Sequence, residues 1–438
     1  MRVAVVGAGI GGLAAAYRLE SQEVPGASVD VFEGSDRVGG KLRLETVGGV
    51  ALDVGAEAML ARRPEAIELA DQVALGDRRV HPETTKASIW TGGALRPLPR
   101  TIMGIPTDVA DAVASGILTE PPAGRAVPLP KRDVSVAEYV RERAGDQVLE
   151  RLVEPLLCGV YAGHADRLSL AAAGEQLKLL GPDPLAAAAQ VPPVDGHVFA
   201  GLVGGIGRLP DALVEQLQAD VHLNAVVRGV ERDGATWVLH TDRGDERYDA
   251  VVVATPAPAT SRLLADVAPR AAFALADVAV ASVAIITFVF DDDIELTGSG
   301  FLVPPVDGTS IKAATFSSSK WGWLAEPGRT VLRASVGRAG DTALMHHDDA
   351  TVSDAALDDL RSALGRLPEP AAWHVQRWGG ALPQYDVGHL ERLDTIDAEL
   401  ATLRGLEVCG ATYRGVGIPA VIASAEAAVQ RLVTDLGE

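Results

Sequence analysis

Three glycines near the start of the chain have the spacing of a phosphate-binding turn. Gly7, Gly9 and Gly12 follow an apolar run and open a stretch rich in alanine and leucine. In such a strand–turn–helix unit the first glycine allows a tight turn, the second lets the backbone approach a pyrophosphate, and the third lets helix and strand pack closely. Glu33 ends the next apolar run, where a carboxylate can accept hydrogen bonds from a ribose. We therefore predict a dinucleotide site with contacts from Gly7, Ala8, Gly9, Ile10, Gly11, Gly12, Glu33 and Gly34.

Two more segments rich in small residues indicate that this ligand is large. Arg37, Gly40 and Lys41 follow the ribose acid directly, and both cations are available to phosphate groups. A second segment, 55–58, follows another apolar run, and its small residues allow the backbone to approach a ligand. Glu57 could equally be a solvated acid in a turn. These segments extend the predicted cofactor contacts to Arg37, Gly40, Lys41, Gly55, Ala56, Glu57 and Ala58.

The elements that must position these residues alternate between strand and helix patterns. Strand patterns at 2–6 and 28–33 flank a helical pattern that ends near residue 19, and a strand, a glycine-rich loop and a helix recur at 406–432. Such units build a parallel sheet. We therefore predict an α/β fold with α+β inserts: a discontinuous Rossmann-like nucleotide-binding domain, a mixed-sheet substrate domain and a helical inserted domain. The predicted domains cover residues 1–80, 200–265 and 385–438; residues 81–100 and 266–384; and residues 101–199.

The regions between these units have patterns of their own. Helical patterns include 168–180, within the predicted helical domain. Alternating apolar residues between 270 and 380 indicate several antiparallel strands, with one helix near 355–367. The longest apolar run, 278–290, is shorter than the ~18 residues that a membrane-spanning helix needs. Its valine, isoleucine and phenylalanine content favours a buried strand.

Composition and charge exclude several classes of protein. The chain has 438 residues, of which 47% are hydrophobic and 22% charged, so it can bury a large core. Its net charge of −20 makes it a poor binder of nucleic acid, and an anionic substrate would need a local group of cations. The two cysteines, Cys158 and Cys409, exclude a disulfide framework and a cysteine-rich metal site, and no metal is predicted. Because the first residues lack the pattern of a signal peptide, we expect a cytoplasmic protein with at most peripheral membrane contact.

Three segments in the middle and at the end of the chain carry a family resemblance. They are EPLLCGVYAG at 154–163, ALPQY at 381–385 and GATYRGVGIP at 410–419. In this order they resemble the FAD-dependent amine oxidase superfamily and, more closely, the protoporphyrinogen/coproporphyrinogen oxidase family of haem synthesis. Two residues depart from the family pattern: His164 stands where an acid is expected, and Ala420 stands where the family usually carries aspartate.

The resemblance implies that the cofactor is FAD and that the Rossmann-like domain binds it. The loop at 410–419 would reach the isoalloxazine ring, and the N-terminus of the following helix would favour negative charge on the reduced ring. Val226 would meet the adenine, and Trp378 could line the flavin or simply belong to the core. The resemblance adds Val226, Trp378, Gly410, Val416, Gly417 and Ile418 to the predicted cofactor contacts.

The segment from Lys86 to Arg100 most resembles the soluble coproporphyrinogen III oxidases of the Gram-positive type, in which a lysine at the position of Lys86 lies near the substrate. The resemblance makes Lys86 the candidate catalytic residue, through substrate positioning. Lys86, Arg96 and Arg100 are the candidate substrate-binding residues, and Lys312 and Lys320 are secondary candidates. The alternative for Lys86 is an ordinary surface lysine.

The activity implied is the oxygen-dependent oxidation of coproporphyrinogen III to coproporphyrin III in haem biosynthesis. It would proceed in three two-electron steps, each of which releases hydrogen peroxide. The expected partners are the porphyrinogen, O2 and, in a transient contact, a ferrochelatase. Two alternatives stay open: the same oxidation of protoporphyrinogen IX, and a non-catalytic flavoprotein scaffold.

Overall fold

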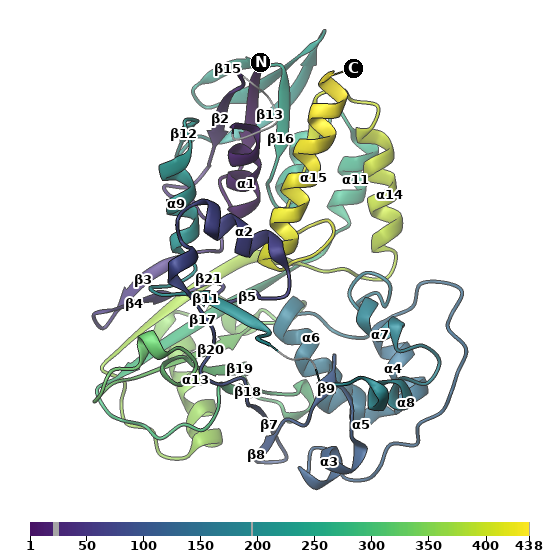
Figure 1. Cartoon of the computed structure of the whole chain (residues 1–438), viewed down its shortest axis with the longest axis vertical. Helices are drawn as coiled ribbons and strands as arrows, with labels where there is room; N and C mark the ends of the chain where they lie inside the picture. The colour runs from purple at the N-terminus through teal and green to yellow at the C-terminus, as the bar shows by residue number, and fades with distance from the viewer. Residues whose placement is uncertain (21–25, 194–195, 438) are drawn as a thin grey trace.

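A five-stranded parallel sheet occupies the upper part of the molecule (Figure 1). The computed structural model describes residues 1–20, 26–193 and 196–437. The strand order is β12-β2-β1-β16-β22, and every pair in it is parallel. Its strands come from three separate stretches of the chain, 2–32, 220–253 and 406–408, which confirms a discontinuous Rossmann-like unit. They are β1 (Arg2–Val6), β2 (Ser28–Phe32), β12 (Asp220–His222), β16 (Ala250–Val253) and β22 (Leu406–Val408).

Helices cover both faces of this sheet. One face carries α1 (Ile10–Arg18), α2 (Pro64–Gln72), α9 (Arg208–Gln216) and α15 (Ile418–Gly437), and the other carries α10 (Ala257–Leu264), α11 (Pro269–Ala276) and α14 (His389–Leu400). Val3 and Val5 of β1 pack on the α1 side, whereas Ala4 and Val6 pack on the α11 side. Because side chains alternate between faces, a strand that is buried on both faces must be apolar throughout.

A second sheet of seven strands lies in the lower part of the molecule (Figure 1). Its order is β21-β17-β20-β19-β18-β7-β8, and it is mixed because β18 and β7 pair in parallel. The apolar run predicted to be a strand forms β17, paired on both sides. The strands are β7 (Ala87–Thr91), β8 (Ala94–Pro97), β17 (Val280–Phe290), β18 (Gly300–Leu302), β19 (Ile311–Phe316), β20 (Thr330–Val336) and β21 (Ala372–Pro383). Among the described residues, no helix combines the length and the apolar character needed to cross a bilayer.

Helix α13 (Asp349–Leu364) packs on one face of the seven-stranded sheet and starts six residues before the predicted 355. The Asp348 side chain accepts a hydrogen bond of 2.8 Å from the Thr351 N–H. This N-cap satisfies a backbone donor at the start of the helix, within a stretch that the sequence pattern marks only as polar. The helix ends before Gly365, whose φ is +81°.

Among the described residues, six α-helices form a third, mostly helical part of the molecule: α3 (Val109–Ala114), α4 (Val136–Ala144), α5 (Asp146–Val148), α6 (Glu154–Tyr161), α7 (Glu175–Leu179) and α8 (Pro184–Gln190). The predicted helix at 168–180 is wrong in its first half, because only α7 is helical there. The Ser169 N–H donates to the Tyr385 carbonyl (2.7 Å) and the Leu170 N–H to the Val134 carbonyl (2.8 Å). These tertiary bonds hold 168–170 as bridges and a turn against the segments of Val134 and Tyr385, so the helix begins only at Glu175.

Candidate cofactor and substrate site

The glycine turn lies between β1 and α1 and has the shape that a pyrophosphate requires. Gly7 has a φ of +105°, and a Cβ atom on Gly12 would lie 1.8 Å from the Gly7 carbonyl oxygen. A Cβ atom on Gly9, in contrast, would meet no described atom within 4 Å. The side of Gly9 is therefore open at the N-terminus of α1, which begins at Ile10, where backbone N–H groups and the helix dipole favour a phosphate. The turn fits the predicted dinucleotide.

Glu33 follows β2 and points at this turn. One carboxylate oxygen accepts from the Ala8 N–H (2.9 Å), and the other accepts from the N–H (2.9 Å) and the hydroxyl (2.8 Å) of Ser35. A carboxylate has about four acceptor sites, so a ribose hydroxyl can still bind. Val226 lies beside Gly34, since a Cβ atom on Gly34 would be 3.5 Å from the Val226 Cγ2. The adenosine contacts predicted from distant parts of the sequence therefore lie together.

The segment after Glu33 folds back against the glycine turn. The Gly39 N–H donates to the Ala8 carbonyl (2.8 Å), and a Cβ atom on Gly40 would lie 3.3 Å from the Gly9 Cα. Arg37 donates to the carbonyls of Val38 (3.0 Å) and Gly40 (2.7 Å). Arg37 therefore orders this backbone beside the open side of the turn.

Lys41 is directed away from solvent. Its Nζ donates to the carbonyl of Ala381, near the C-terminal end of strand β21. Burial lowers the pKa of Lys41. The Lys41 carbonyl would lie 2.0 Å from a Cβ atom on Gly55, so that only glycine fits there. Trp378 packs on the same backbone and donates from Nε1 to the Val54 carbonyl (3.1 Å). These contacts pack the segments that contain Lys41, Gly55 and Trp378 against one another.

Glu57 is held by two cations from the seven-stranded sheet region. Its oxygens accept from the Nζ of Lys320 (2.6 Å) and from the guanidinium of Arg333, which also donates to the Gly55 carbonyl (2.7 Å). Burial alone would raise the pKa of Glu57, but the two cations outweigh it and lower the pKa to about 2. With 15% of its side chain exposed, Glu57 is not the solvated turn acid of the alternative interpretation. Lys320, a secondary substrate candidate, is committed to this ion pair.

Asp53, at the end of β4 (Val50–Asp53), connects the strand that leads to Gly55 with the start of α9. Its two oxygens accept from the N–H groups of Ile206 (2.9 Å) and Gly207 (2.8 Å), just before α9. Burial raises the pKa of Asp53 to about 6, although these backbone donors act in the opposite direction. No local pattern in the sequence identifies these partners, because they lie more than 150 positions away.

The C-terminal loop runs from Gly410 to the start of α15 at Ile418. Gly410 and Gly415 have φ values of +122° and +135°, which favour glycine. A Cβ atom on Gly11 would lie 3.1 Å from the Val421 side chain and 3.7 Å from the Gly410 Cα, so the loop and α15 pack directly on α1. The predicted contacts Val416, Gly417 and Ile418 therefore follow a backbone that meets the glycine turn.

The three predicted substrate cations point to different parts of the chain. Lys86 is exposed just before β7, and its carbonyl accepts from Ser299. The Nε of Arg96 donates to the Thr91 carbonyl at 3.4 Å, and Arg100 donates to the carbonyls of Val191 (2.8 Å) and Pro192 (2.5 Å). Arg96 and Arg100 thus have backbone acceptors already, and substrate binding by all three stays a prediction.

Lys312 is the buried cation among the secondary candidates. It is 6% exposed, and its Nζ donates to the Gly337 carbonyl at 2.8 Å. Burial lowers the pKa of Lys312 to about 8. Arg338 lies nearby, with its Nε 3.3 Å from the Sγ of Cys158 on α6. Sequence reasoning missed Arg338, because no motif marks it.

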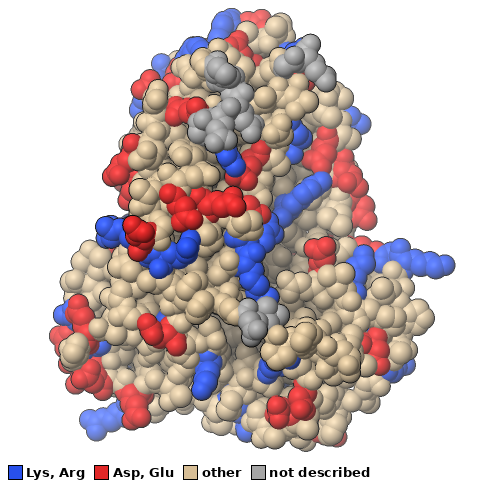
Figure 2. All heavy atoms as spheres, viewed as in Figure 1, with Lys and Arg blue, Asp and Glu red and all other residues tan. Residues whose placement is uncertain are grey.

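Charge is unevenly distributed over the face shown in Figure 2. Lysine and arginine side chains gather across the middle of this face, where the surface is indented between the two ends of the molecule. Acidic side chains are prominent above and below this band. A chain with a net charge of −20 can therefore still present cations locally.

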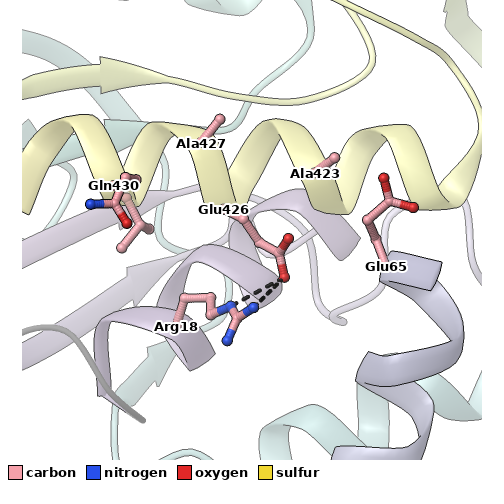
Figure 3. Close-up of a pocket in the computed structure, with 7 residues that line it drawn as sticks. Arg18, Glu65, Ala423, Glu426, Ala427 and Gln430 are labelled. Atoms are coloured by element: carbon pink, nitrogen blue, oxygen red, sulfur yellow. Dashed lines mark hydrogen bonds and ion pairs between the residues drawn. The ribbon is translucent and has the colours of Figure 1, made fainter. Parts of the chain in front are cut away.

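A separate hollow lies on the outer side of α15 (Figure 3). Arg18 at the end of α1 donates to Glu426 on α15 (2.8 Å), and Glu65 of α2 points toward the same hollow. The ion pair ties the helix after the glycine turn to the helix after the C-terminal loop. The hollow itself lies apart from the glycine turn and contains none of the predicted site residues.

Comparisons with known proteins cover almost the entire chain. Residues 10–433 match the family described as flavin containing amine oxidoreductase. A Mycobacterium tuberculosis protein named coproporphyrinogen III oxidase is 37% identical, over 99% of this chain and 97% of its own length. A Bacillus subtilis protein of the same name is 31% identical, over 99% and 98%. A solved structure from Exiguobacterium sp. 255-15, assigned as a protoporphyrinogen oxidase, is 31% identical with a TM-score of 0.88 and covers 100% of this chain and 99% of that one.

Proposed function

The chain belongs to the family of flavin-containing amine oxidoreductases, and we propose that it is an FAD-dependent oxidase that converts coproporphyrinogen III to coproporphyrin III. One observation carries this proposal: relatives named coproporphyrinogen III oxidase match along nearly the full length of both chains. A match restricted to the glycine turn would support nucleotide binding alone, because that turn occurs in enzymes of many activities.

The residues of the chain divide the work of holding the cofactor. The glycine turn and the N-terminus of α1 would bind the pyrophosphate, and Glu33 would bind the ribose next to Val226. Residues 55–58, Trp378 and 416–418 would surround the ring system. The N-terminus of α15 would favour negative charge at the pyrimidine edge. When bound, FAD supplies the acceptor for the hydride equivalents that leave the porphyrinogen.

The substrate carries four propionates, so this acidic chain must attract it with local cations. We assign that task to Lys86, which is exposed before β7, with Arg96 and Arg100 in support. We assign substrate binding to the domain of the seven-stranded sheet (81–100 and 266–384), with the helical part (101–199) as a separate inserted domain. We assign FAD binding to residues 1–80, 200–265 and 385–438, to which the sheet domain adds Trp378. An exposed charge pair contributes only ~0–1 kcal/mol, so a cation must lose water on binding to set specificity.

The surroundings of the reaction are part of the same proposal. O2 would be the final electron acceptor and hydrogen peroxide the second product. The protein would act in the cytoplasm as an enzyme of haem biosynthesis, and a ferrochelatase would be a transient partner.

Anaerobic mixing tests the proposal directly. Coproporphyrinogen III should bleach the visible absorption of the protein-bound flavin, and admission of O2 should restore it with formation of hydrogen peroxide. The control is the same mixture with fully oxidised coproporphyrin III, which has no hydride equivalents to give. A flavin that stays oxidised with both reduced macrocycles, coproporphyrinogen III and protoporphyrinogen IX, would identify the protein as a non-catalytic scaffold instead.

Oxidation of protoporphyrinogen IX is the second candidate, and the Exiguobacterium structure assigned to that activity favours it. The two substrates differ in that vinyl groups replace two of the propionates. Initial rates with both porphyrinogens at equal concentration separate the candidates. Faster oxidation of protoporphyrinogen IX would replace the coproporphyrinogen proposal with this one.

A further inference from the structure

The loop that leads to the predicted flavin contacts is bridged by a single phenol. Tyr385 follows β21 and is 2% exposed. Its hydroxyl donates to the Ala411 carbonyl (2.6 Å) and accepts from the Gly415 N–H (2.7 Å). The two bonded groups stand four residues apart in the loop, so one side chain closes the loop on itself.

The neighbouring imidazole holds the middle of the same loop. His389, the first residue of α14, stacks on Tyr385 with ring centroids 4.1 Å apart. Its Nε2 lies 3.0 Å from the Tyr413 carbonyl. A carbonyl only accepts, so Nε2 must carry the proton. Burial lowers the pKa of His389 and raises that of Tyr385, which keeps both rings neutral.

Tyr385 itself stands on a rigid base. Its carbonyl accepts from the Ser169 N–H (2.7 Å), and its ring lies 5.5 Å from that of Tyr161 on α6. The side-chain amide of Gln384 donates to the Tyr161 carbonyl at 2.7 Å. Contacts with the helical part of the molecule thus fix the Tyr385 side chain, whose hydroxyl bonds to the loop.

The loop needs such support because of its composition. Gly410, Gly415 and Gly417 give its backbone more conformational freedom than other residues would. We propose that Tyr385 is a positioning residue for the flavin ring, which it aligns by fixing the Ala411–Gly415 backbone, with His389 as its partner. The proposal depends on the cofactor placement given above and is independent of which porphyrinogen is oxidised.

Tyr385→Phe tests the proposal, and Tyr139→Phe is the matched control. The Tyr139 side chain is fully buried too, and its hydroxyl contacts the carbonyls of Leu177 (2.9 Å) and Gly181 (2.7 Å) in the helical part. FAD affinity of the apoprotein, the visible flavin spectrum and the flavin reduction potential are measured without substrate. Tyr385→Phe should weaken FAD binding about tenfold, or ~1.4 kcal/mol, and change the spectrum and the potential. Tyr139→Phe should keep the FAD affinity within about twofold of the parent and leave the spectrum and the potential unchanged.

A second variant keeps the test decisive if Tyr385→Phe does not fold. His389→Phe retains an aromatic ring against Tyr385 but loses the donor to the Tyr413 carbonyl, and it should also weaken FAD binding severalfold. Parent-like FAD affinity and spectrum in a folded Tyr385→Phe protein, or equal changes in the Tyr139→Phe protein, would overturn the proposal. A reversed porphyrinogen preference would contradict the proposed substrate and leave these flavin measurements unaffected.

Discussion

Arg333 on β20 of the seven-stranded sheet forms an ion pair with Glu57 in the loop after β4, with an N–O contact at 2.5 Å. Arg333 is 7% exposed and also donates to the Gly55 carbonyl. Lys320 occupies the second oxygen of Glu57. The segment 55–58, predicted to approach the flavin, is therefore held by a strand of the seven-stranded sheet. Removal of the Glu57 carboxylate would leave Arg333 and Lys320 without their anionic partner.

Glu57→Gln should destabilise the protein at neutral pH and remove part of its acid sensitivity. The pKa of Glu57 is about 2 when folded, against 4.5 ordinarily. The unfolded state thus binds more protons between these values, and the stability due to the carboxylate is present above pH 4.5 and lost as the pH falls toward 2. At ~1.4 kcal/mol per pKa unit, the contribution is on the order of 3 kcal/mol.

Urea unfolding at pH 7, 4 and 3, with FAD in excess, checks this prediction. The deficit of Glu57→Gln should be largest at pH 7 and shrink at pH 3. Glu326→Gln, which breaks a surface pair with 63% of the Glu326 side chain exposed, should change the free energy of unfolding by less than ~1 kcal/mol. A deficit that stays constant from pH 7 to pH 3 would contradict the ionic explanation.

Asp53→Asn should alter the pH dependence in the opposite direction. Burial raises the pKa of Asp53 to about 6, from an ordinary 3.8. The folded state then binds more protons in this interval, so stability falls as the pH rises from about 4 to about 6 and is level above that. The asparagine cannot ionise, and its unfolding free energy should be flatter by up to ~3 kcal/mol over that interval. Parallel pH profiles for parent and variant would rule this out.

Gly9→Val should give a folded protein without flavin. The backbone of Gly9 is extended (φ −70°, ψ 174°), which valine tolerates, and its Cβ would meet no described atom within 4 Å. The side chain would instead fill the space assigned to the pyrophosphate. Gly12→Val is the contrasting variant, because its Cβ would lie 1.8 Å from the Gly7 carbonyl oxygen and should disrupt folding. The flavin-to-protein absorbance ratio and the melting temperature distinguish the two variants. Full flavin content in Gly9→Val would refute the assignment of the pyrophosphate to the glycine turn.

Lys86→Ala should weaken coproporphyrinogen III binding more than protoporphyrinogen IX binding. A propionate that displaces water from this lysine would make a charge-assisted bond of roughly 1.5–3 kcal/mol. We expect KM for coproporphyrinogen III to rise about tenfold, with a smaller rise for protoporphyrinogen IX. Lys131→Ala, at another exposed lysine, should change neither. Equal effects of Lys86→Ala on both substrates would show that Lys86 does not discriminate between them.

Elements whose signals are local could be predicted from the order of the residues alone. The spacing of Gly7, Gly9 and Gly12 prescribes a turn, because the need for a missing side chain arises within a few residues. Apolar runs such as 278–290 likewise prescribe buried strands, since burial on both faces excludes polar residues. The family motifs, read in order, added the flavin and the oxidase activity.

The side chains that support the site, in contrast, became identifiable only from the packing of distant segments. Glu57 meets Arg333 across 276 positions, and the Tyr385 hydroxyl meets Gly415 across 30. The backbone donor of Ser169 bonds to Tyr385, where a local pattern predicted a helix. Such pairings depend on how separate sheets and helices pack, and no periodicity in the sequence records that arrangement. Solvation energy then makes the pairing obligatory, because a buried charge or backbone donor must find its partner wherever the fold brings one.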